Sequence, residues 1–389
     1  MSMLEHRSCP LCQADEAENY LRAPDRFALA EGEAYTLQRC RRCGMIYLNP
    51  RPFEADSGRY YQHAEYLPFA SVASPRSLME KLYAALRRVN LQWKKRLITR
   101  FRDRGTMLDA GCGTGELLAF MRARGWQVRG LERDAAAAEW GRTHLQLPIQ
   151  TGSIDAIADT PETYDVITMW HVLEHVYDPG AALRTLARLL KKEGVLIVAV
   201  PNIAGVDAKF YQQHWIALDV PRHVNHFSLS SLARCAAQQG FTLRRWQQLP
   251  LDAFFNALLS ERLQAAHLQS PAWLMPLRLL RAGALALASL LAGSRTPFTS
   301  APAGATLVAV FENVLIHRAA ADALSASDAA EEVLQRLHGW TPPGFSAPLV
   351  AASRGETLEL VPDPELLIYH VNLQTTVALP TKSDPRRIS

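Results

Sequence analysis

The sequence predicts a doubly wound α/β fold with a mostly parallel seven-stranded sheet, preceded by a small cysteine-bearing module and interrupted by a helical insertion. Three observations lead to this fold class. Short apolar runs alternate with amphipathic stretches from residue 105 to residue 250, a glycine-rich loop follows the first apolar run, and two Cys-x-x-Cys pairs occupy the first 50 residues. Alternating strands and helices are typical of a parallel sheet with helices on both faces.

The elements of the sheet follow one another at short intervals. Strands are expected at 106–111, 127–132, 148–152, 164–170, 195–202, 241–249 and 304–312, and helices at 115–125, 134–145, 178–194 and 228–240. Most of these helices have glycine just past their ends, and several have Asp or Ser near their start. Local helix signals therefore agree with the global pattern.

Four segments are expected along the chain. Residues 1–50 form the cysteine-bearing module, 51–104 a connector and helical lid, 105–312 the α/β core with a helical insertion at 251–300, and 313–389 an extension of unknown role. The helix of the second segment follows from apolar residues at three- and four-residue spacing.

The composition is that of an ordinary globular protein. The 389 residues include 48% hydrophobic and 21% charged side chains, with a net charge of +4, which allows a sizeable core and does not demand nucleic acid as a partner. The N-terminus has no apolar leader, so six cysteines indicate a reducing, cytoplasmic compartment. The Leu- and Ala-rich stretch 273–293 contains Arg278 and Arg281, so a buried or amphipathic helix is expected, with membrane-surface contact as the alternative.

Asp109, Gly111, Gly113 and Gly115 form the loop after the first core strand. This is the switch position of a doubly wound fold, where ligands bind outside the carboxyl ends of strands. The absence of a following Gly-Lys-Ser/Thr excludes a phosphate loop, and the glycine spacing differs from that of dinucleotide sites. Asp109 suits a cationic ligand, and Glu132 at the end of the second strand suits ribose hydroxyls. A ligand with a ribose and a positive group, such as S-adenosylmethionine, is therefore expected.

The stretches 109–115, 130–132 and 164–170, in this order, closely resemble the class I S-adenosylmethionine-dependent methyltransferases, which have a Rossmann-like sheet. The resemblance covers about residues 105–250 and the strand at 304–312. It implies that the glycine loop lies along the methionine part of the cofactor and that Glu132 holds the ribose.

The resemblance also implies roles for residues at the ends of the third and fourth strands. Ser153 and Ile154 would flank the adenine. Met169, Trp170 and His171 would line the site of methyl transfer.

Cys9, Cys12, Cys40 and Cys43 form two Cys-x-x-Cys knuckles separated by 27 residues. Four thiolates close a tetrahedral shell, and Zn²⁺ is the default metal for such a site. Because a full shell leaves no open position, the expected zinc is structural. The module and the core behind it resemble a bacterial group of zinc-linked methyltransferases, some of which methylate sugar nucleotides at carbon.

Two histidine-rich segments follow the fourth and fifth strands. The His171, Glu174, His175 spacing also occurs in zinc proteases, but its place after the fourth strand resembles ubiquinone-pathway O-methyltransferases. That resemblance implies a divalent cation at Glu174 and His175, although His171 stands where those relatives have an acid. A buried Glu–His pair that anchors the loop is the alternative.

The segment 218–228 offers His223 and His226 on the face where an acceptor should enter. A histidine near neutral pKa can take a proton from an attacking group. The expected base is His226 or His223, with His171 third. The alternative is a loop that caps the following helix through Ser228.

The expected function is methyl transfer from S-adenosylmethionine to oxygen or carbon of a small-molecule acceptor, such as a sugar nucleotide, a polysaccharide or lipid precursor, or a natural product. One alternative is an RNA or ribosomal methyltransferase that grips RNA through the zinc module, near Arg39, Arg41 and Arg42. The other is an inactive scaffold that only binds the cofactor. An Asn-Pro-Pro-type signature is absent after the fourth strand, which disfavours RNA, and the intact glycine loop disfavours the scaffold.

Overall fold

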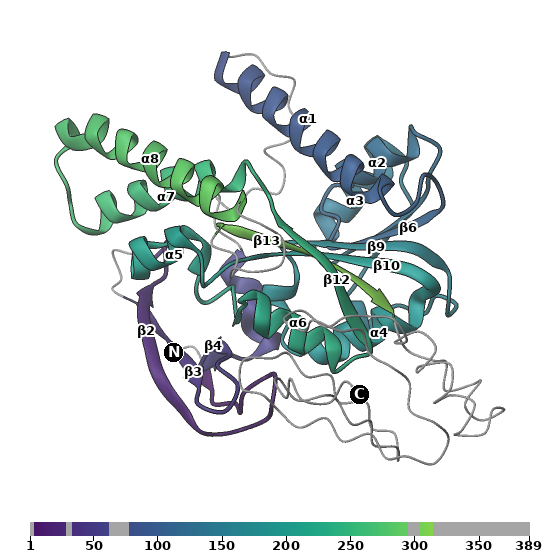
Figure 1. The fold of residues 1–389 in the computed structure, drawn as a ribbon, viewed down its shortest axis with the longest axis horizontal. Coiled ribbons are helices and arrows are strands. Elements are labelled where there is room, and N and C mark those ends of the chain that lie inside the picture. Colours follow the sequence, from purple (N-terminus) through teal and green to yellow (C-terminus); the bar gives the residue numbers. More distant parts are fainter. Residues whose placement is uncertain (1–3, 29–32, 62–77, 295–303, 314–389) are drawn as a thin grey trace, which may run out of the picture. The chain divides into compact units, whose positions relative to one another are not determined.

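The computed structural model describes residues 4–28, 33–61, 78–294 and 304–313 (Figure 1). The expected extension at 313–389 lies outside the described residues except for Asn313, which ends the last strand.

The centre of the fold is a seven-stranded sheet. Its strands are β6 (Thr106–Ala110), β7 (Gln127–Glu132), β8 (Ile149–Thr151), β9 (Tyr164–Trp170), β10 (Leu190–Pro201), β12 (Phe241–Gln248) and β13 (Thr306–Asn313). The order across the sheet is β12-β13-β10-β9-β6-β7-β8, and β13 runs antiparallel to both of its neighbours. The predicted fold class is confirmed. Because β7 and β9 flank β6, the chain reverses direction across the sheet there, which is where a doubly wound fold binds its ligand.

Helices cover both faces of this sheet. Leu97 of α1 (Leu78–Thr99) and Met121 of α2 (Glu116–Arg122) pack on one face. On the other face, α4 (Pro179–Leu189) and α6 (Leu229–Ala237) pack through residues such as Leu186 and Leu232. Helix α3 (Ala135–Leu145) begins where Asp134 accepts hydrogen bonds from Ala136 and Ala137, as its N-cap signal predicts.

The N-terminal segment is joined to the core through a shared sheet. Three of its strands come from the N-terminal segment, β2 (Ala17–Pro24), β3 (Ala34–Cys40) and β4 (Ile46–Leu48), and β11 (Asn225–His226) comes from the core and pairs with β4. The order of the strands in this sheet is β11-β4-β3-β2. Strands β1 (Leu4–Glu5) and β5 (Arg51–Pro52) form a separate pair, and a 3₁₀ helix follows at Glu54–Tyr61. The cysteine-bearing segment is therefore built into the core.

The predicted helical insertion lies between β12 and β13. It consists of α7 (Asp252–His267), a 3₁₀ turn (Ala272–Leu274) and α8 (Met275–Ser294). Figure 1 shows α7 and α8 side by side, with α5 (Val206–Tyr211) against them. Among the described residues, the segment Ala272–Leu291 is the one helix long and apolar enough to cross a membrane by length and composition.

Candidate functional site

The loop between β6 and α2 has the backbone conformation of a ligand cradle. Gly111 and Gly113 have φ angles of +77° and +56°, which strain any L side chain. A Cβ on Gly111 would collide with Val172, whereas a Cβ on Gly113 would meet nothing within 4 Å. The open space above Gly113 fits a ligand that approaches the backbone closely.

Glu132 lies opposite this loop at the end of β7. Its Oε2 accepts the Gly113 N–H at 2.7 Å, and its Oε1 accepts the Asp134 N–H at 2.8 Å. Each carboxylate oxygen retains acceptor capacity for a ligand hydroxyl. The structure thus brings Glu132 and the glycine loop together, as the predicted cofactor requires.

The other predicted cofactor residues lie at the ends of β8 and β9. Ser153 is exposed and precedes the 3₁₀ turn Ile154–Ala156, in which Ile154 is buried. Met169 is fully buried within the core on one side of β9. Trp170 lies on the other side, 6.4 Å from Trp93 in an edge-to-face contact.

Asp109 is buried at the end of β6. Thr168 donates a 2.6 Å hydrogen bond to its Oδ1. Burial raises the pKa of Asp109 to about 6, against the lowering effects of Thr168 and Lys94. Such a carboxylate is half charged at about pH 6, and a cationic ligand stabilises the charged form.

Cofactor binding should therefore weaken as pH falls through about 6, because protonation of Asp109 removes the charge that faces a cationic ligand. One proton limits the loss to about tenfold per pH unit. Calorimetric titration of S-adenosylmethionine across this range measures the slope. An Asp109→Asn variant should bind weakly throughout and lack the Asp109 step; a step of unchanged size in that variant would refute this role for Asp109.

Lys94 and Asp252 approach the carboxyl end of β9 from helices α1 and α7. The Lys94 Nζ lies 4.2 Å from the centre of the Trp170 ring. Asp252 accepts hydrogen bonds at Oδ2 from Thr306 Oγ1 at 2.8 Å and from His171 Nε2 at 3.0 Å. Sequence reasoning missed Lys94 and Asp252, since neither belongs to a motif.

His171 follows β9 with a φ of +58°, an uncommon conformation that is frequent at functional sites. Its Nε2 contacts Asp252, and its Nδ1 lies 3.4 Å from Glu174 Oε1. Against the opposing effect of burial, the two carboxylates raise the pKa of His171 to about 10. A protonated imidazole has no lone pair to accept a proton, so the structure disfavours His171 as the base.

His223 and His226 also differ from the prediction. They are 8% and 4% exposed. The Nδ1 of His223 is bonded to the Ala217 carbonyl at 2.8 Å, and the Nε2 of His226 to the Leu218 carbonyl at 3.0 Å. These contacts hold the two rings against their own loop, so the structure disfavours them as bases that meet an acceptor.

The same loop fastens the N-terminal segment to the core. The buried Arg222 guanidinium bonds Asp25 and Asp219, each at 2.7 Å. Arg26 reaches Asp219 at 2.9 Å. Both partners of the Arg222–Asp25 pair are almost fully buried, and loss of either would leave an uncompensated charge. The histidine-rich segment thus has a structural role, and Ser228 caps α6 through a capping box with Ser231, as the alternative interpretation predicts.

Glu174, His175 and His223 bring their ligand atoms within 4.8 Å of one another. Glu174 is 1% exposed, and neither carboxylate oxygen has a hydrogen bond within the described part of the chain. The Nδ1 atoms of both histidines are occupied, that of His175 by Tyr61 and the Arg222 carbonyl. Their Nε2 atoms can then bind a metal ion through the lone pair, which is the usual arrangement for histidine ligands. A buried carboxylate that has only His171 as an ionic partner and lies beside two such nitrogens fits a divalent cation.

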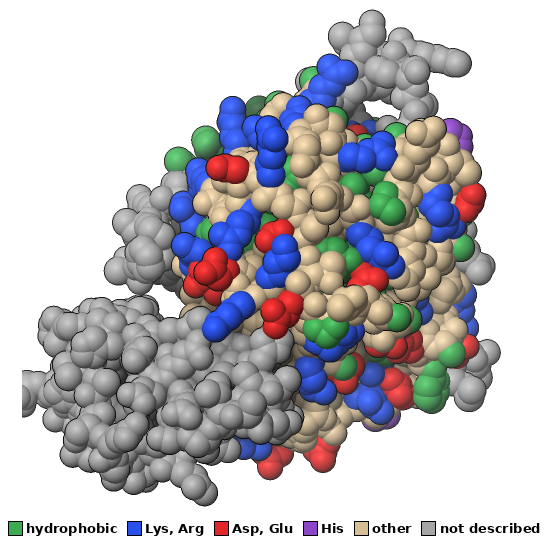
Figure 2. Space-filling model, turned by 90° about the vertical axis from the view of Figure 1, so that its right-hand side faces the viewer, with side chains coloured by type: hydrophobic (Ala, Val, Ile, Leu, Met, Phe, Trp, Pro, Cys, Tyr) green, Lys and Arg blue, Asp and Glu red, His purple; other side chains and the backbone are tan. Residues whose placement is uncertain are grey.

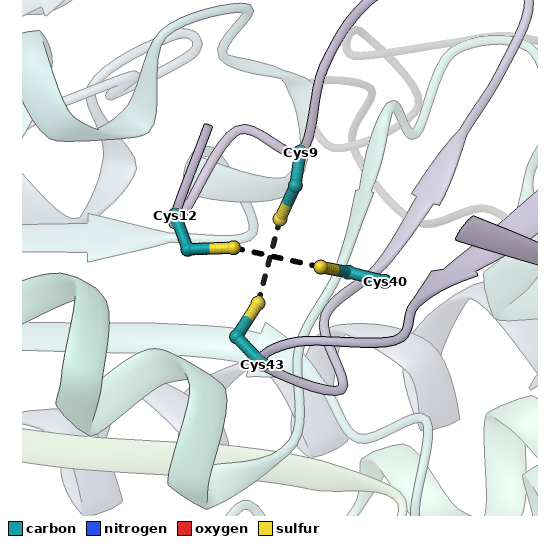
Figure 3. A group of neighbouring side chains, drawn as sticks. All are labelled: Cys9, Cys12, Cys40 and Cys43. Carbon is teal, nitrogen blue, oxygen red and sulfur yellow. Dashed lines mark hydrogen bonds between the residues drawn. The ribbon is translucent and has the colours of Figure 1, made fainter. Parts of the chain in front are cut away.

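The four cysteines converge on one point from two knuckles (Figure 3). The Sγ atoms of Cys9 and Cys43 are 3.4 Å apart, and those of Cys12 and Cys40 are 3.5 Å apart. Zn–S bonds of about 2.3 Å imply tetrahedral S···S separations of about 3.8 Å. The cluster therefore has nearly the dimensions of a tetrathiolate zinc site.

Comparison with known proteins agrees with this geometry. A family described as a methyltransferase domain matches residues 79–245. The ubiquinone biosynthesis O-methyltransferase of Idiomarina loihiensis is 31% identical over 171 residues, which cover 40% of this chain and 69% of that protein. The protein of the same name from Nitrosomonas europaea is 35% identical over 103 residues, or 25% of this chain and 44% of that protein. The match thus spans less than half of one of these relatives.

Among solved structures, geranyl diphosphate C-methyltransferase from Streptomyces coelicolor A3(2) is similar at 17% identity, with a TM-score of 0.42 over 63% of this chain and 88% of that chain. The fold of this chain is established by its own strand order. With more than two thirds of the Idiomarina protein matched at 31% identity, the chain belongs to the family of the ubiquinone biosynthesis O-methyltransferases and is an S-adenosylmethionine-dependent methyltransferase.

Proposed function

We propose that this methyltransferase acts on a small-molecule acceptor whose attacking oxygen or carbon loses its proton to Lys94. The observation that carries the proposal is the position of the Lys94 Nζ over Trp170, at the carboxyl end of β9. When bound, S-adenosylmethionine supplies a methyl group that its positive sulfur already activates. The protein then has to orient the acceptor, which contributes about 7–11 kcal/mol, and to accept one proton.

The surroundings of Lys94 support a role in proton transfer. Burial lowers the pKa of its ammonium group, although three acids oppose this effect: Asp109 on β6, Asp252 on α7 and Glu116 on α2. A lysine with a lowered pKa is a better base near neutral pH. The edge-to-face pair of Trp93 and Trp170 adds an apolar wall beside the amine, and apolar walls limit the access of water.

The acceptor class is tested by release of S-adenosylhomocysteine from the full chain. Sugar nucleotides, lipid-linked precursors, small phenols and ribosomal RNA are offered separately. Turnover on a small molecule that requires Lys94 supports the proposal. Turnover on RNA alone would replace it with the RNA alternative, and cofactor binding without turnover on any acceptor would favour a scaffold.

The face of the molecule drawn in Figure 2 offers little support for the RNA alternative. Figure 2 shows Lys and Arg side chains interspersed with Asp and Glu on the face in view. Nucleic-acid-binding proteins more often gather their basic side chains on one face or along one helix. Arg41 and Arg39, near the second knuckle, contact Glu18 and the ring of Tyr20.

The four cysteines are proposed to bind one structural Zn²⁺. Cys9 and Cys40 belong to the same buried cluster as Leu108 of β6 and Phe227. A metal there would fix the knuckles against the core sheet, and four thiolates leave no position for an acceptor.

Glu174, His175 and His223 are proposed to hold a second divalent cation. Two imidazoles and one carboxylate suit a transition metal better than Ca²⁺ or Mg²⁺. Addition of Mn²⁺ to zinc-loaded protein should raise its stability by about 2.7 kcal/mol at about 100 times the Kd, measured as an increase in Tm.

Glu174→Gln should abolish this increase in Tm, whereas Glu139→Gln, which changes an exposed glutamate of α3, should retain it. Without Mn²⁺, the Tm of Glu174→Gln shows whether the variant folds, since the substitution also removes the contact between Glu174 and His171. An unchanged Tm of wild type at saturating Mn²⁺ would exclude the site.

A further inference from the structure

Helix α8 leaves most of its leucines exposed, while Arg278 and Arg281 reach Glu261 on α7. Trp273, Leu277, Leu280 and Leu287 are 74%, 62%, 72% and 53% exposed. Together with the exposed Ala284, they recur every three or four residues and so lie along one side of the helix. We call this set the apolar face. It extends over most of a segment that is only 17% buried.

The other side of α8 packs through both apolar and polar residues, since Ala282 and Ala286 share a buried cluster with Ala257 of α7. Glu261 is fully buried and accepts hydrogen bonds from Arg281 Nε at 2.5 Å, Arg278 at 3.2 Å and Tyr211 at 3.0 Å. Ser260 and Ser289 are also fully buried. In a water-facing amphipathic helix the charges lie outside and the leucines inside. Helix α8 has this packed side and, in addition, the exposed apolar face, which indicates that the apolar face meets an apolar medium.

We propose that the α7–α8 hairpin docks this methyltransferase on the surface of an anionic lipid bilayer, with the apolar face immersed at the interface. An exposed apolar stripe with tryptophan at one end is typical of helices that lie in the plane of a membrane. Such a stripe is longer than the scattered apolar residues of ordinary protein surfaces.

The distribution of charge favours an anionic bilayer, rather than a second copy of the chain, as the partner of the apolar face. The two acids between residues 252 and 291 face inward, because Glu261 is buried and Asp252 bonds His171 and Thr306. Arg262 on α7 and Lys209 on the neighbouring α5 are exposed. Two such basic rims would repel each other in a symmetric dimer. Basic residues are instead attracted to an anionic leaflet.

The test is flotation of the full chain with vesicles of equal parts phosphatidylglycerol and phosphatidylcholine, and with phosphatidylcholine alone. The triple variant Leu277→Gln, Leu280→Gln, Leu287→Gln removes the apolar face. Its matched control changes three exposed apolar residues elsewhere, Leu4→Gln, Phe53→Gln and Val89→Gln. Equal Tm values for the two variants establish that both fold.

Wild type and control should float with the anionic vesicles, and less protein should float at high salt. The triple variant of α8, called the hairpin variant, should partition into the vesicles about 100-fold less than wild type. Unchanged flotation of the hairpin variant, or no flotation of wild type, would overturn the proposal. The proposal would also be overturned if wild type and control were dimers in solution and only the triple variant of α8 were monomeric. Flotation requires neither cofactor nor acceptor, so a negative result leaves the methyltransferase assignment intact.

Discussion

Replacing Lys94 by methionine is expected to lower kcat by about 10²–10⁴-fold, the usual contribution of a general base. Methionine retains most of the apolar volume beside Trp170 but has no nitrogen to accept a proton. Cofactor affinity should change little by comparison. Steady-state release of S-adenosylhomocysteine, together with calorimetry of cofactor binding, separates the two effects.

The dependence of kcat on pH tests whether Lys94 acts as a base. Only neutral Lys94 can accept a proton, so kcat should rise with pH through the lowered pKa of Lys94. The Lys94→Met variant should lose this limb of the profile. Lys95→Met, one residue along α1, is the matched control and should retain both rate and limb. If Lys94→Met turns over as fast as Lys95→Met, proton transfer by Lys94 is excluded.

Loss of the proposed zinc should have the second large effect. Apparent binding free energies of structural zinc in small domains are about 10–16 kcal/mol, and Cys40 is buried in the core cluster that includes β6. Cys40→Ser should therefore lower Tm sharply, in one transition with the methyltransferase core. Differential scanning calorimetry, with zinc measured by mass spectrometry, tests this.

Cys235→Ala is the control, because Cys235 is a buried cysteine that does not belong to the four-cysteine site. It should retain one zinc per chain and lose only the small stability of a truncated side chain. Wild-type protein that is free of metal and yet has an unchanged Tm would contradict a structural role for the four cysteines.

The sequence predicted the parts of this fold whose signals are local. Apolar runs marked the seven strands, and the helix caps at Asp134 and Asp178 lie where expected. The spacing of Asp109, Gly113 and Glu132 was informative because parallel strands align their carboxyl ends at one edge of a sheet. The cysteine knuckles were equally local, since each pair needs only a tight turn.

The rest depended on long-range packing. Lys94 reaches Trp170 only because α1 crosses the sheet at the end of β9, which periodicity does not specify. Asp252 meets His171 across 81 residues of sequence. His226 looked like a base in isolation, but it lies in a two-residue strand that pairs with β4. Such a strand is too short to leave a sequence pattern.

The central claim is that S-adenosylmethionine binds at the carboxyl edge of β6 and β7, over Gly113 and beside Glu132. Calorimetric titration of zinc-loaded wild type with S-adenosylhomocysteine should give one site per chain. Gly113→Val should abolish that binding, because its side chain fills the open space above the loop and strains the backbone at a φ of +56°; its Tm establishes that it folds. Absence of binding to folded wild type, or equal binding by Gly113→Val, would contradict the claim.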